Sequence, residues 1–237
     1  MKSISGIIIK VHDSNEADKI VKIITSNGDK LSLLAKGVKK SKSKKSHAIE
    51  LGNHIKIQTN NKYSIPIITE IKVLNEPFHW KESYRRLILL QLACEILDSL
   101  TAEDLEDPRF FLYTKQFLYM EHRNFDLSFA IWMLYMLNVS GNLGNLKNSV
   151  ITEKNIKLES VAKLTDKIGY INLNESEFSQ KIDAKIIKSQ LFALKTNLYS
   201  ASRIKLDEEL TSKLFDIHLD WIEIAIEKQL KSKKLLY

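Results

Sequence analysis

The chain has 237 residues, with 36 Lys or Arg, 29 Asp or Glu and a formal net charge of +7. A chain of this length forms one large domain or two modest ones, and either can bury a hydrophobic core. Its single cysteine, Cys94, excludes an internal disulfide framework and any zinc site built from cysteine pairs. No apolar run is long enough for a membrane span or typical of a signal peptide, so we expect a soluble, cytoplasmic protein.

The positive charge is confined to the first third of the chain. Residues 1–80 hold 14 Lys, no Arg and 7 acidic residues, whereas residues 81–237 hold 22 basic and 22 acidic residues. Such an asymmetry indicates one part that meets a polyanion and another with a different task. The codon bias of an AT-rich genome would explain why the bases are lysines, but not why their surplus lies at one end.

The first third has the pattern of short strands. Within residues 53–61, Ile55 and Ile57 alternate with Lys56, which predicts a strand with one buried face. The sequence Asn27-Gly28 is a strong hairpin signal, and a second hairpin is expected at residues 60–62. The five predicted strands are residues 4–12, 17–26, 30–38, 53–61 and 63–74. Their number and spacing predict a small OB-fold barrel.

After residue 76 the apolar residues recur with helical spacing. Pro108 suits the first turn of a helix, and the stretch 145–181 is polar with one strand-like piece at 168–171. The predicted helices are residues 83–100, 110–121, 125–139, 185–199 and 207–230. We therefore predict an α+β protein, with a five-stranded OB-fold barrel at residues 1–77 and an all-helical domain at residues 78–237.

The most distinctive segment is the lysine loop, residues 36–46, which follows the third predicted strand. It contains six Lys, three Ser and one apolar side chain, Val38. Its cations could neutralise several phosphates at the barrel rim, where OB-folds meet nucleic acid, although a solvated loop without a ligand has the same composition. The predicted nucleic-acid-binding residues of the barrel are Lys10, Lys22, Lys30, Lys36, Lys39, Lys40, Lys42, Lys44, Lys45, Lys56, Lys62 and Tyr63.

The predicted barrel is poor in aromatic residues. Tyr63 is the only Phe, Tyr or Trp before Phe78. OB-folds that grip single strands by stacking carry several aromatics, so we expect this barrel to hold phosphates and to leave the bases free. Free bases can pair, and annealing of complementary strands would follow.

Signals of catalysis are weak. The sequence has no Gly-rich phosphate loop and no His-Glu-x-x-His motif. Cys94 lies among apolar residues of a predicted helix, which favours a core position, and the carboxylates of residues 103–107 favour a solvated loop before a helix. We therefore predict no catalytic residue, no metal site and no cofactor.

Two features of the helical part could bind partners. Arg123 lies beside Phe125 and Phe129, so a cation and aromatic rings could receive an acidic, apolar peptide. The alternative is a first-turn residue above ordinary core Phe residues. The C-terminal Lys231, Lys233 and Lys234 could add phosphate contacts, or only cap the last helix at its negative end.

Several segments, in this order, resemble the RecO family of bacterial DNA-repair and recombination mediator proteins. The segments that carry the resemblance are residues 6–10, 16–21, 25–30, 34–39 with the lysine loop, 125–137 and 230–235. The resemblance is strongest over residues 4–74, is weaker over 80–147 and returns near 218–236. The order and spacing of these segments, rather than any single motif, identify the family.

The resemblance implies a protein that is not an enzyme. Members of the family bind single- and double-stranded DNA, anneal complementary strands and, with RecR, help to load RecA onto strands covered by single-stranded DNA-binding protein. They also dock the acidic C-terminal tail of that protein on the helical domain, at a stretch that the resemblance places at residues 123–127. A nucleoid-associated, cytoplasmic location follows. Position 124, where a second Arg is frequent, is Asn124 here. Many members hold zinc through four Cys in the region of residues 145–181, and because this chain has none there, zinc is not expected.

The runner-up is an OB-fold protein that binds RNA or associates with the ribosome. Acceleration of annealing between protein-coated DNA strands would distinguish the two functions, because a simple RNA binder should not produce it.

Overall fold

The computed structural model describes residues 3–39, 46–60, 64–103 and 106–236. The chain divides into two compact units, one formed by Met1–Tyr119 with Gln229–Tyr237 and the other by Met120–Lys228. The last barrel strand ends at Asn75, two residues before the predicted boundary between residues 77 and 78. The first compact unit extends beyond it, because two helices that follow the barrel pack against it.

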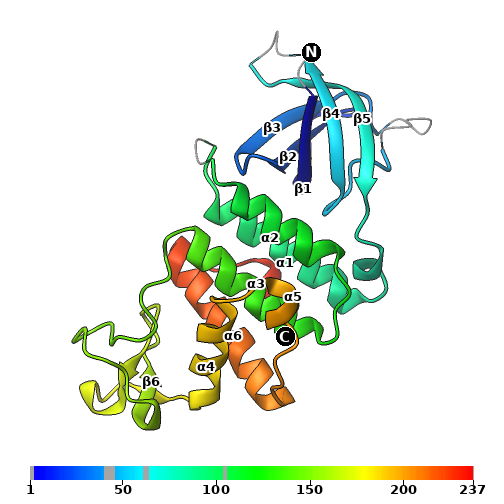
Figure 1. Cartoon of the computed structure of the whole chain (residues 1–237). Helices are drawn as coiled ribbons and strands as arrows, with labels where there is room; N and C mark the ends of the chain where they lie inside the picture. The colour runs from blue at the N-terminus through cyan, green and yellow to red at the C-terminus, as the bar shows by residue number, and fades with distance from the viewer. Residues whose placement is uncertain (1–2, 40–45, 61–63, 104–105, 237) are drawn as a thin grey trace. The chain divides into compact units, whose positions relative to one another are not determined.

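The first unit contains the closed five-stranded barrel that the sequence predicts (Figure 1). Its strands are β1 (Ser3–Asp13), β2 (Lys19–Thr25), β3 (Lys30–Ala35), β4 (His54–Asn60) and β5 (Ile67–Asn75). They are joined in the order β1-β2-β3-β5-β4, and β4 pairs back onto β1. The β3–β5 pair is parallel and joins Leu34 to Ile67, and all other pairs are antiparallel.

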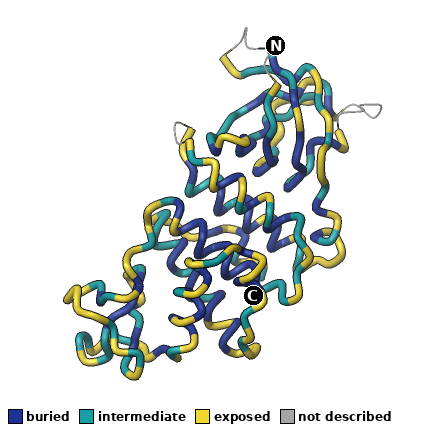
Figure 2. Tube along the Cα trace, in the orientation of Figure 1, coloured by how far each residue is buried: buried dark blue, intermediate teal, exposed yellow. Residues whose placement is uncertain are grey.

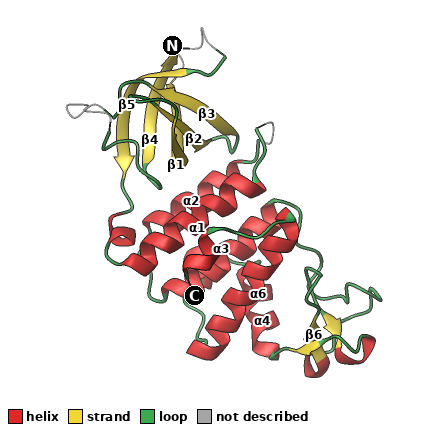
Figure 3. Ribbon diagram, turned by 180° about the vertical axis from the view of Figure 1, so that it is seen from behind, coloured by secondary structure: helices red, strands yellow, loops and turns green. Residues whose placement is uncertain are grey.

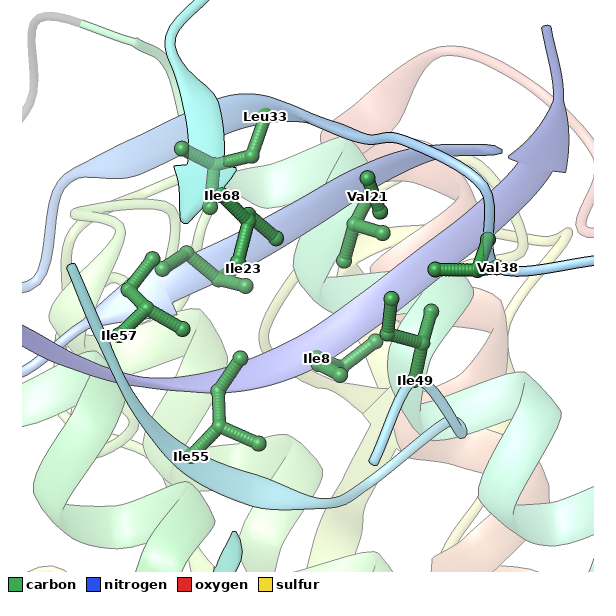
Figure 4. Packing of buried hydrophobic residues seen from close by; sticks show 10 residues of the cluster. Ile8, Val21, Ile23, Leu33, Val38, Ile49, Ile55, Ile57 and Ile68 are labelled. Carbon is green, nitrogen blue, oxygen red and sulfur yellow. The ribbon is translucent and has the colours of Figure 1, made fainter. Parts of the chain in front are cut away.

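The interior of the barrel consists of aliphatic side chains (Figure 4). Ile55 and Ile57 are buried while Lys56 between them is exposed, so the alternation predicted for this strand is confirmed. Each fully buried side chain of this size contributes roughly 1.5–3 kcal/mol. The buried residues of this core are Ile8, Val21, Ile23, Leu33, Ala35, Val38, Ile49, Ile55, Ile57 and Ile68.

The β2–β3 turn needs its glycine for two reasons. Gly28 has φ +91°, and its N–H donates to the carbonyl of Thr25 at 2.9 Å, which closes the predicted hairpin. A Cβ at this position would lie 1.9 Å from the backbone oxygen of Asp107. The hairpin at residues 60–62 falls partly outside the described residues.

The first unit also contains helices, two of which, α1 (Tyr84–Leu100) and α2 (Pro108–Tyr119), pack against barrel strands. The others are η1 (Phe78–Lys81) and the C-terminal η4 (Ser232–Leu235). Pro108 opens α2, as its fixed φ favours. Ile7 and Ile24 are paired across β1 and β2 and are fully buried, because α1 and α2 pack against these strands. The indole N–H of Trp80 donates to the carbonyl of Leu118 at 3.0 Å.

The second unit is built around α3, which is buried along most of its length (Figure 2). Its helices are α3 (Phe125–Val139), α4 (Ala184–Ala193), α5 (Leu198–Ala201) and α6 (Glu208–Ile226). Helix α3 packs against α6, and a buried hydrogen-bond chain joins them. His218 is at the centre of these hydrogen bonds: its Nδ1 lies 2.7 Å from the carbonyl of Ala130 and its Nε2 lies 2.7 Å from Gln190 Nε2. The hydroxyl of Tyr170 in turn donates to Gln190 Oε1 at 2.7 Å.

Three predicted helices differ from the structure at their ends. The helix predicted at residues 110–121 is α2, which begins and ends two residues earlier, at Pro108 and Tyr119. The segment 185–199 is two helices, because the hydroxyl of Tyr135 donates to the carbonyls of Ala193 and Thr196 and Asn197 caps a new helix. The last helix, predicted at residues 207–230, begins at Glu208 with Asp207 as its cap. It ends at Ile226, because Glu227 takes a left-handed conformation with φ +53°.

The polar stretch 145–181 contains a small sheet in the order β7-β6-β8. Its central strand, β6, is labelled in Figure 3. The elements of this stretch are η2 (Leu158–Ser160), β6 (Val161–Lys163), β7 (Ile171–Asn172), η3 (Leu173–Glu175) and β8 (Gln180–Lys181). Ala162, Leu164 and Ile171 form its apolar core. Asn172 and Thr152 donate to the carboxylate of Glu175 at 2.9 and 2.8 Å, which ties the loops of this stretch together.

Candidate nucleic-acid interface

The described base of the lysine loop is fixed on the β1–β2 connection. Lys36 and Lys39 are both exposed. Lys39 Nζ lies 2.8 Å from the carboxylate of Asp13 and donates to the carbonyl of Asn15 at 2.8 Å, while the N–H of Gly37 donates to Asp18 at 2.7 Å. The hydrogen bond from Lys39 lowers the pKa of Asp13. The loop therefore leaves the barrel from an anchored position.

Six of the predicted residues lie outside the described residues. These are Lys40, Lys42, Lys44, Lys45, Lys62 and Tyr63. Their place at the interface stays a prediction.

Three predicted lysines converge on one carboxylate of α1. Lys10 Nζ lies 2.7 Å from Asp98, and the Nζ atoms of Lys22 and Lys30 each lie 3.3 Å from it. Burial raises the pKa of Asp98, but the hydrogen bond from Lys10 and the charges of Lys30 and Lys22 outweigh it and lower the pKa to about 2. One negative charge thus meets three positive ones, and the cluster keeps a surplus of two. Lys10, with half of its side chain exposed, is the most accessible of the three.

The β4–β5 face carries a cationic pair that the sequence analysis identified only in part. Lys56 and Lys72 are direct partners across the two strands, and both are exposed. Like charges directly opposite on a sheet repel, and an anion bound between them would relieve the repulsion. Lys72 was missed, although the Glu-Ile-Lys-Val alternation of residues 70–73 could have placed it on the outer face with Lys56. Beside this pair, Gln58 donates to Glu70 at 2.7 Å.

The predicted peptide-docking residues do not share one surface. Arg123 is exposed and precedes Asn124, which caps α3. Phe125 is half-buried, and its ring centroid lies 4.3 Å from that of His122. Phe129 is fully buried, with Trp132 and Phe215 at 5.5 and 5.4 Å between ring centroids. Phe129 therefore occupies a core position, and Arg123 and Phe125 remain at the start of α3.

Lys233 and Lys234 lie on η4, which packs against α1, and Lys231 immediately precedes it. The backbone N–H groups of Lys231 and Ser232 donate to the carboxylate of Glu95 at 2.8 and 2.9 Å. Lys231 and Lys234 are exposed, and Lys233 is half-buried. This anchoring brings the C-terminal lysines into the same compact unit as the barrel.

The structure gives Cys94 the core position that the sequence favoured. It is buried, and burial raises the pKa of its thiol to about 12, so the nucleophilic thiolate is suppressed. Across the described ranges, no three His, Cys, Asp or Glu side chains are grouped so as to hold a metal ion. No helix among the described residues is long and apolar enough to cross a membrane.

Comparison with known proteins identifies one family along almost the whole chain. Residues 1–77 match the family model described as recombination protein O N terminal, and residues 81–234 match recombination protein O C terminal. The DNA repair protein RecO of Symbiobacterium thermophilum is 22% identical over 244 residues, covering 99% of this chain and 96% of the relative. That of Clostridium perfringens is 26% identical over 240 residues, covering 98% and 95%. That of Mycoplasma capricolum is 24% identical over 151 residues, covering 61% and 60%.

Proposed function

The chain belongs to the recombination protein O family, and on this premise we propose that it is a non-enzymatic mediator of DNA repair and homologous recombination. Its barrel binds the backbone phosphates of single- and double-stranded DNA, and it anneals complementary strands. It acts in the cytoplasm, in association with the nucleoid.

The surplus of positive charge on the closed barrel supports this proposal most directly. The exposed Lys56–Lys72 pair, the two surplus charges around Asp98 and the exposed Lys36 belong to the same compact unit. Phosphate contacts position a nucleic acid without reading its sequence. The barrel interior is aliphatic, and no Phe, Tyr or Trp lies among the described residues of its five strands.

Annealing follows from this division between charge and bases. Lysines that neutralise phosphates reduce the repulsion between two strands, and bases that are not stacked on protein remain free to pair. No covalent bond is formed or broken in this process. The protein therefore acts as a binding surface that promotes pairing.

In this proposal the helical unit binds partner proteins. Arg123, with the half-buried ring of Phe125 close by, receives the acidic tail of single-stranded DNA-binding protein, the cation taking the carboxylate. RecR joins the protein for the loading of RecA onto the coated strand.

The salt dependence of DNA binding tests the barrel site. Replacement of Lys36, Lys56 and Lys72 by Ala should reduce the slope of log affinity against log salt by about 0.7 for each lost contact to a single strand. A control with Lys154, Lys157 and Lys167 replaced by Ala removes the same charge from exposed positions of the other unit. If the two triple variants show equal slopes, the barrel is not the phosphate site.

An annealing assay tests the second half of the proposal. Complementary strands coated with single-stranded DNA-binding protein should pair faster with the protein than without it, and the barrel variant should lose this acceleration. A protein that only binds RNA would not accelerate the pairing. Absence of acceleration with the unmodified protein would overturn the annealing function.

A further inference from the structure

The neutral balance of the C-terminal part conceals a second basic segment. Residues 184–206 contain four Lys, one Arg and no acidic residue. The acids that flank the segment, Asp183 and Asp207, cap helices: Asp183 accepts from the N–H of Lys185, and Asp207 from that of Leu210. The segment spans α4 and α5, which pack against each other within the second unit (Figure 1). Its charge is therefore concentrated on one part of that unit.

The cations of this segment all face solvent. No ion pair of a described residue engages Lys185, Lys188 or Lys205. The guanidinium of Arg203 lies over the ring of Tyr199, 4.0 Å from its centroid. We call the following exposed set the α4–α5 surface: Lys185, Lys188, Phe192, Lys195, Tyr199, Arg203 and Lys205.

Two aromatic rings lie among these cations. Phe192 is 48% exposed and Tyr199 is 45% exposed. A cavity of about 500 Å³ opens beside Phe192 and is also bounded by Lys188 and Arg203. Ile204 and Leu206 complete an apolar wall. This volume lies within the ~300–1,000 Å³ that is typical of small-ligand sites.

We propose that the α4–α5 surface is a second nucleic-acid site, which binds a single strand by stacking bases on Phe192 and Tyr199 and by pairing phosphates with the surrounding cations. Stacking on an aromatic ring beside a basic groove is the general chemistry of binding to single strands. The described β-strands of the barrel lack such rings. The barrel therefore contacts phosphates, whereas the α4–α5 surface also contacts bases.

The spread of charge favours a strand over an acidic peptide. An acidic, apolar peptide needs one cation beside one apolar pocket. Here four cations, Lys185, Lys188, Arg203 and Lys205, bound the cavity. A second exposed ring, Tyr199, lies outside the residues that bound it but contacts the guanidinium of Arg203. A single strand of nucleic acid, with one phosphate and one planar base in every nucleotide, matches this arrangement.

The inference rests on the proposed function and gives annealing a physical basis. With one strand on the barrel and a second on the α4–α5 surface, a single chain holds both partners of a pairing event. Bases on Phe192 and Tyr199 would leave these rings when they pair with the complementary strand. The α4–α5 surface should therefore matter most for single strands and little for duplexes.

Binding to a fluorescent oligothymidylate and to a duplex of equal length tests the site. Replacement of Phe192 and Tyr199 by Ala should lower affinity for the single strand about tenfold and leave duplex affinity unchanged. The double variant Lys188→Glu with Arg203→Glu should lower affinity for the single strand more strongly. Lys154→Glu with Lys167→Glu is the matched control, since both residues are exposed in the same unit.

Crosslinking separates this site from the barrel site. Ultraviolet irradiation of the unmodified complex should attach thymine to Phe192 or Tyr199, and the attachment should persist when Lys56 and Lys72 are replaced by Ala. If the α4–α5 variants bind oligothymidylate normally, the inference fails while the barrel site stands. If they instead lose only the binding of an acidic peptide ending in Asp-Phe, the surface is a peptide site and the inference is overturned.

Discussion

Lys30 on β3 and Asp98 on α1 make two contacts with each other, although 68 positions separate them. Lys30 Nζ lies 3.3 Å from the Asp98 carboxylate and donates to the backbone carbonyl of the same residue at 2.8 Å. Only a tenth of the Lys30 side chain is exposed. Since Lys10 and Lys22 share this carboxylate, Asp98 both fixes α1 on the barrel and withholds positive charge from a ligand.

Asp98→Asn should change stability and DNA binding in opposite directions. Without the carboxylate the three lysines repel one another, so the free energy of unfolding should fall by roughly 1–2 kcal/mol. The cations are released at the same time, so affinity for DNA should rise and its salt dependence should steepen. Urea unfolding and fluorescence anisotropy measure the two effects.

The control is Asp166→Asn, which makes the same charge change at an exposed residue of the second unit. Equal DNA affinities for the two variants would show that Asp98 does not restrain the lysines. Because the folded pKa of Asp98 is about 2, below its ordinary 3.8, its contribution is complete above about pH 4 and is lost as the pH falls toward 2.

Acid should also weaken the second unit through His218. Burial lowers the pKa of His218 from 6.5 to about 4, so the ring is neutral, and its Nδ1–H donates to Ala130. Folding must exclude the proton, so stability is complete above pH 6.5 and declines as the pH falls toward 4. Trp221, whose ring centroid lies 5.7 Å from that of His218, provides a fluorescence signal for unfolding at each pH.

His218→Gln separates the pH effect from packing. The variant should be less stable at pH 7, because Gln190 and Ala130 lose a buried partner. Its stability should depend less on pH between 6.5 and 4 than that of the unmodified protein. An unchanged pH profile would assign the acid sensitivity to other groups.

Gly28→Ala should destabilise the barrel unit strongly. The new Cβ would meet the Asp107 backbone at 1.9 Å, and φ +91° is unfavourable for alanine. Strain and overpacking together should cost roughly 2–5 kcal/mol. Gly37→Ala is the matched control, because Gly37 also has a positive φ of 71° but nothing lies within 4 Å of its Cβ position. In thermal unfolding, Gly37→Ala should have a clearly higher Tm than Gly28→Ala.

Lys72→Glu should stabilise the sheet and weaken DNA binding. The new carboxylate would face Lys56 across β4 and β5, so repulsion becomes attraction, a gain of about 0.2–1 kcal/mol. The same change removes a phosphate contact and adds a charge that repels phosphate. Lys72→Ala serves as the comparison, since it relieves the repulsion without a new charge. A Lys72→Glu protein that binds DNA as tightly as the unmodified one would exclude this face from the interface.

Features that depend on neighbouring residues could be read from the sequence. Ile55 and Ile57 faced inward because alternation is a property of the strand itself. The Asn27-Gly28 turn and Pro108 at the start of α2 depend on backbone preferences within a few residues. The confinement of the surplus charge to the first third also required only counting.

The use of each charge and ring was decided by tertiary packing. Lys30 lay on the predicted strand, yet its partner is a carboxylate of α1, and no local pattern indicates that pair. Lys72 became the neighbour of Lys56 only through the register of β4 and β5. Phe129, which could have faced a ligand, is buried because α6 places Phe215 beside it. Secondary structure follows from short-range sterics and periodicity, whereas pairing and burial depend on which distant elements meet.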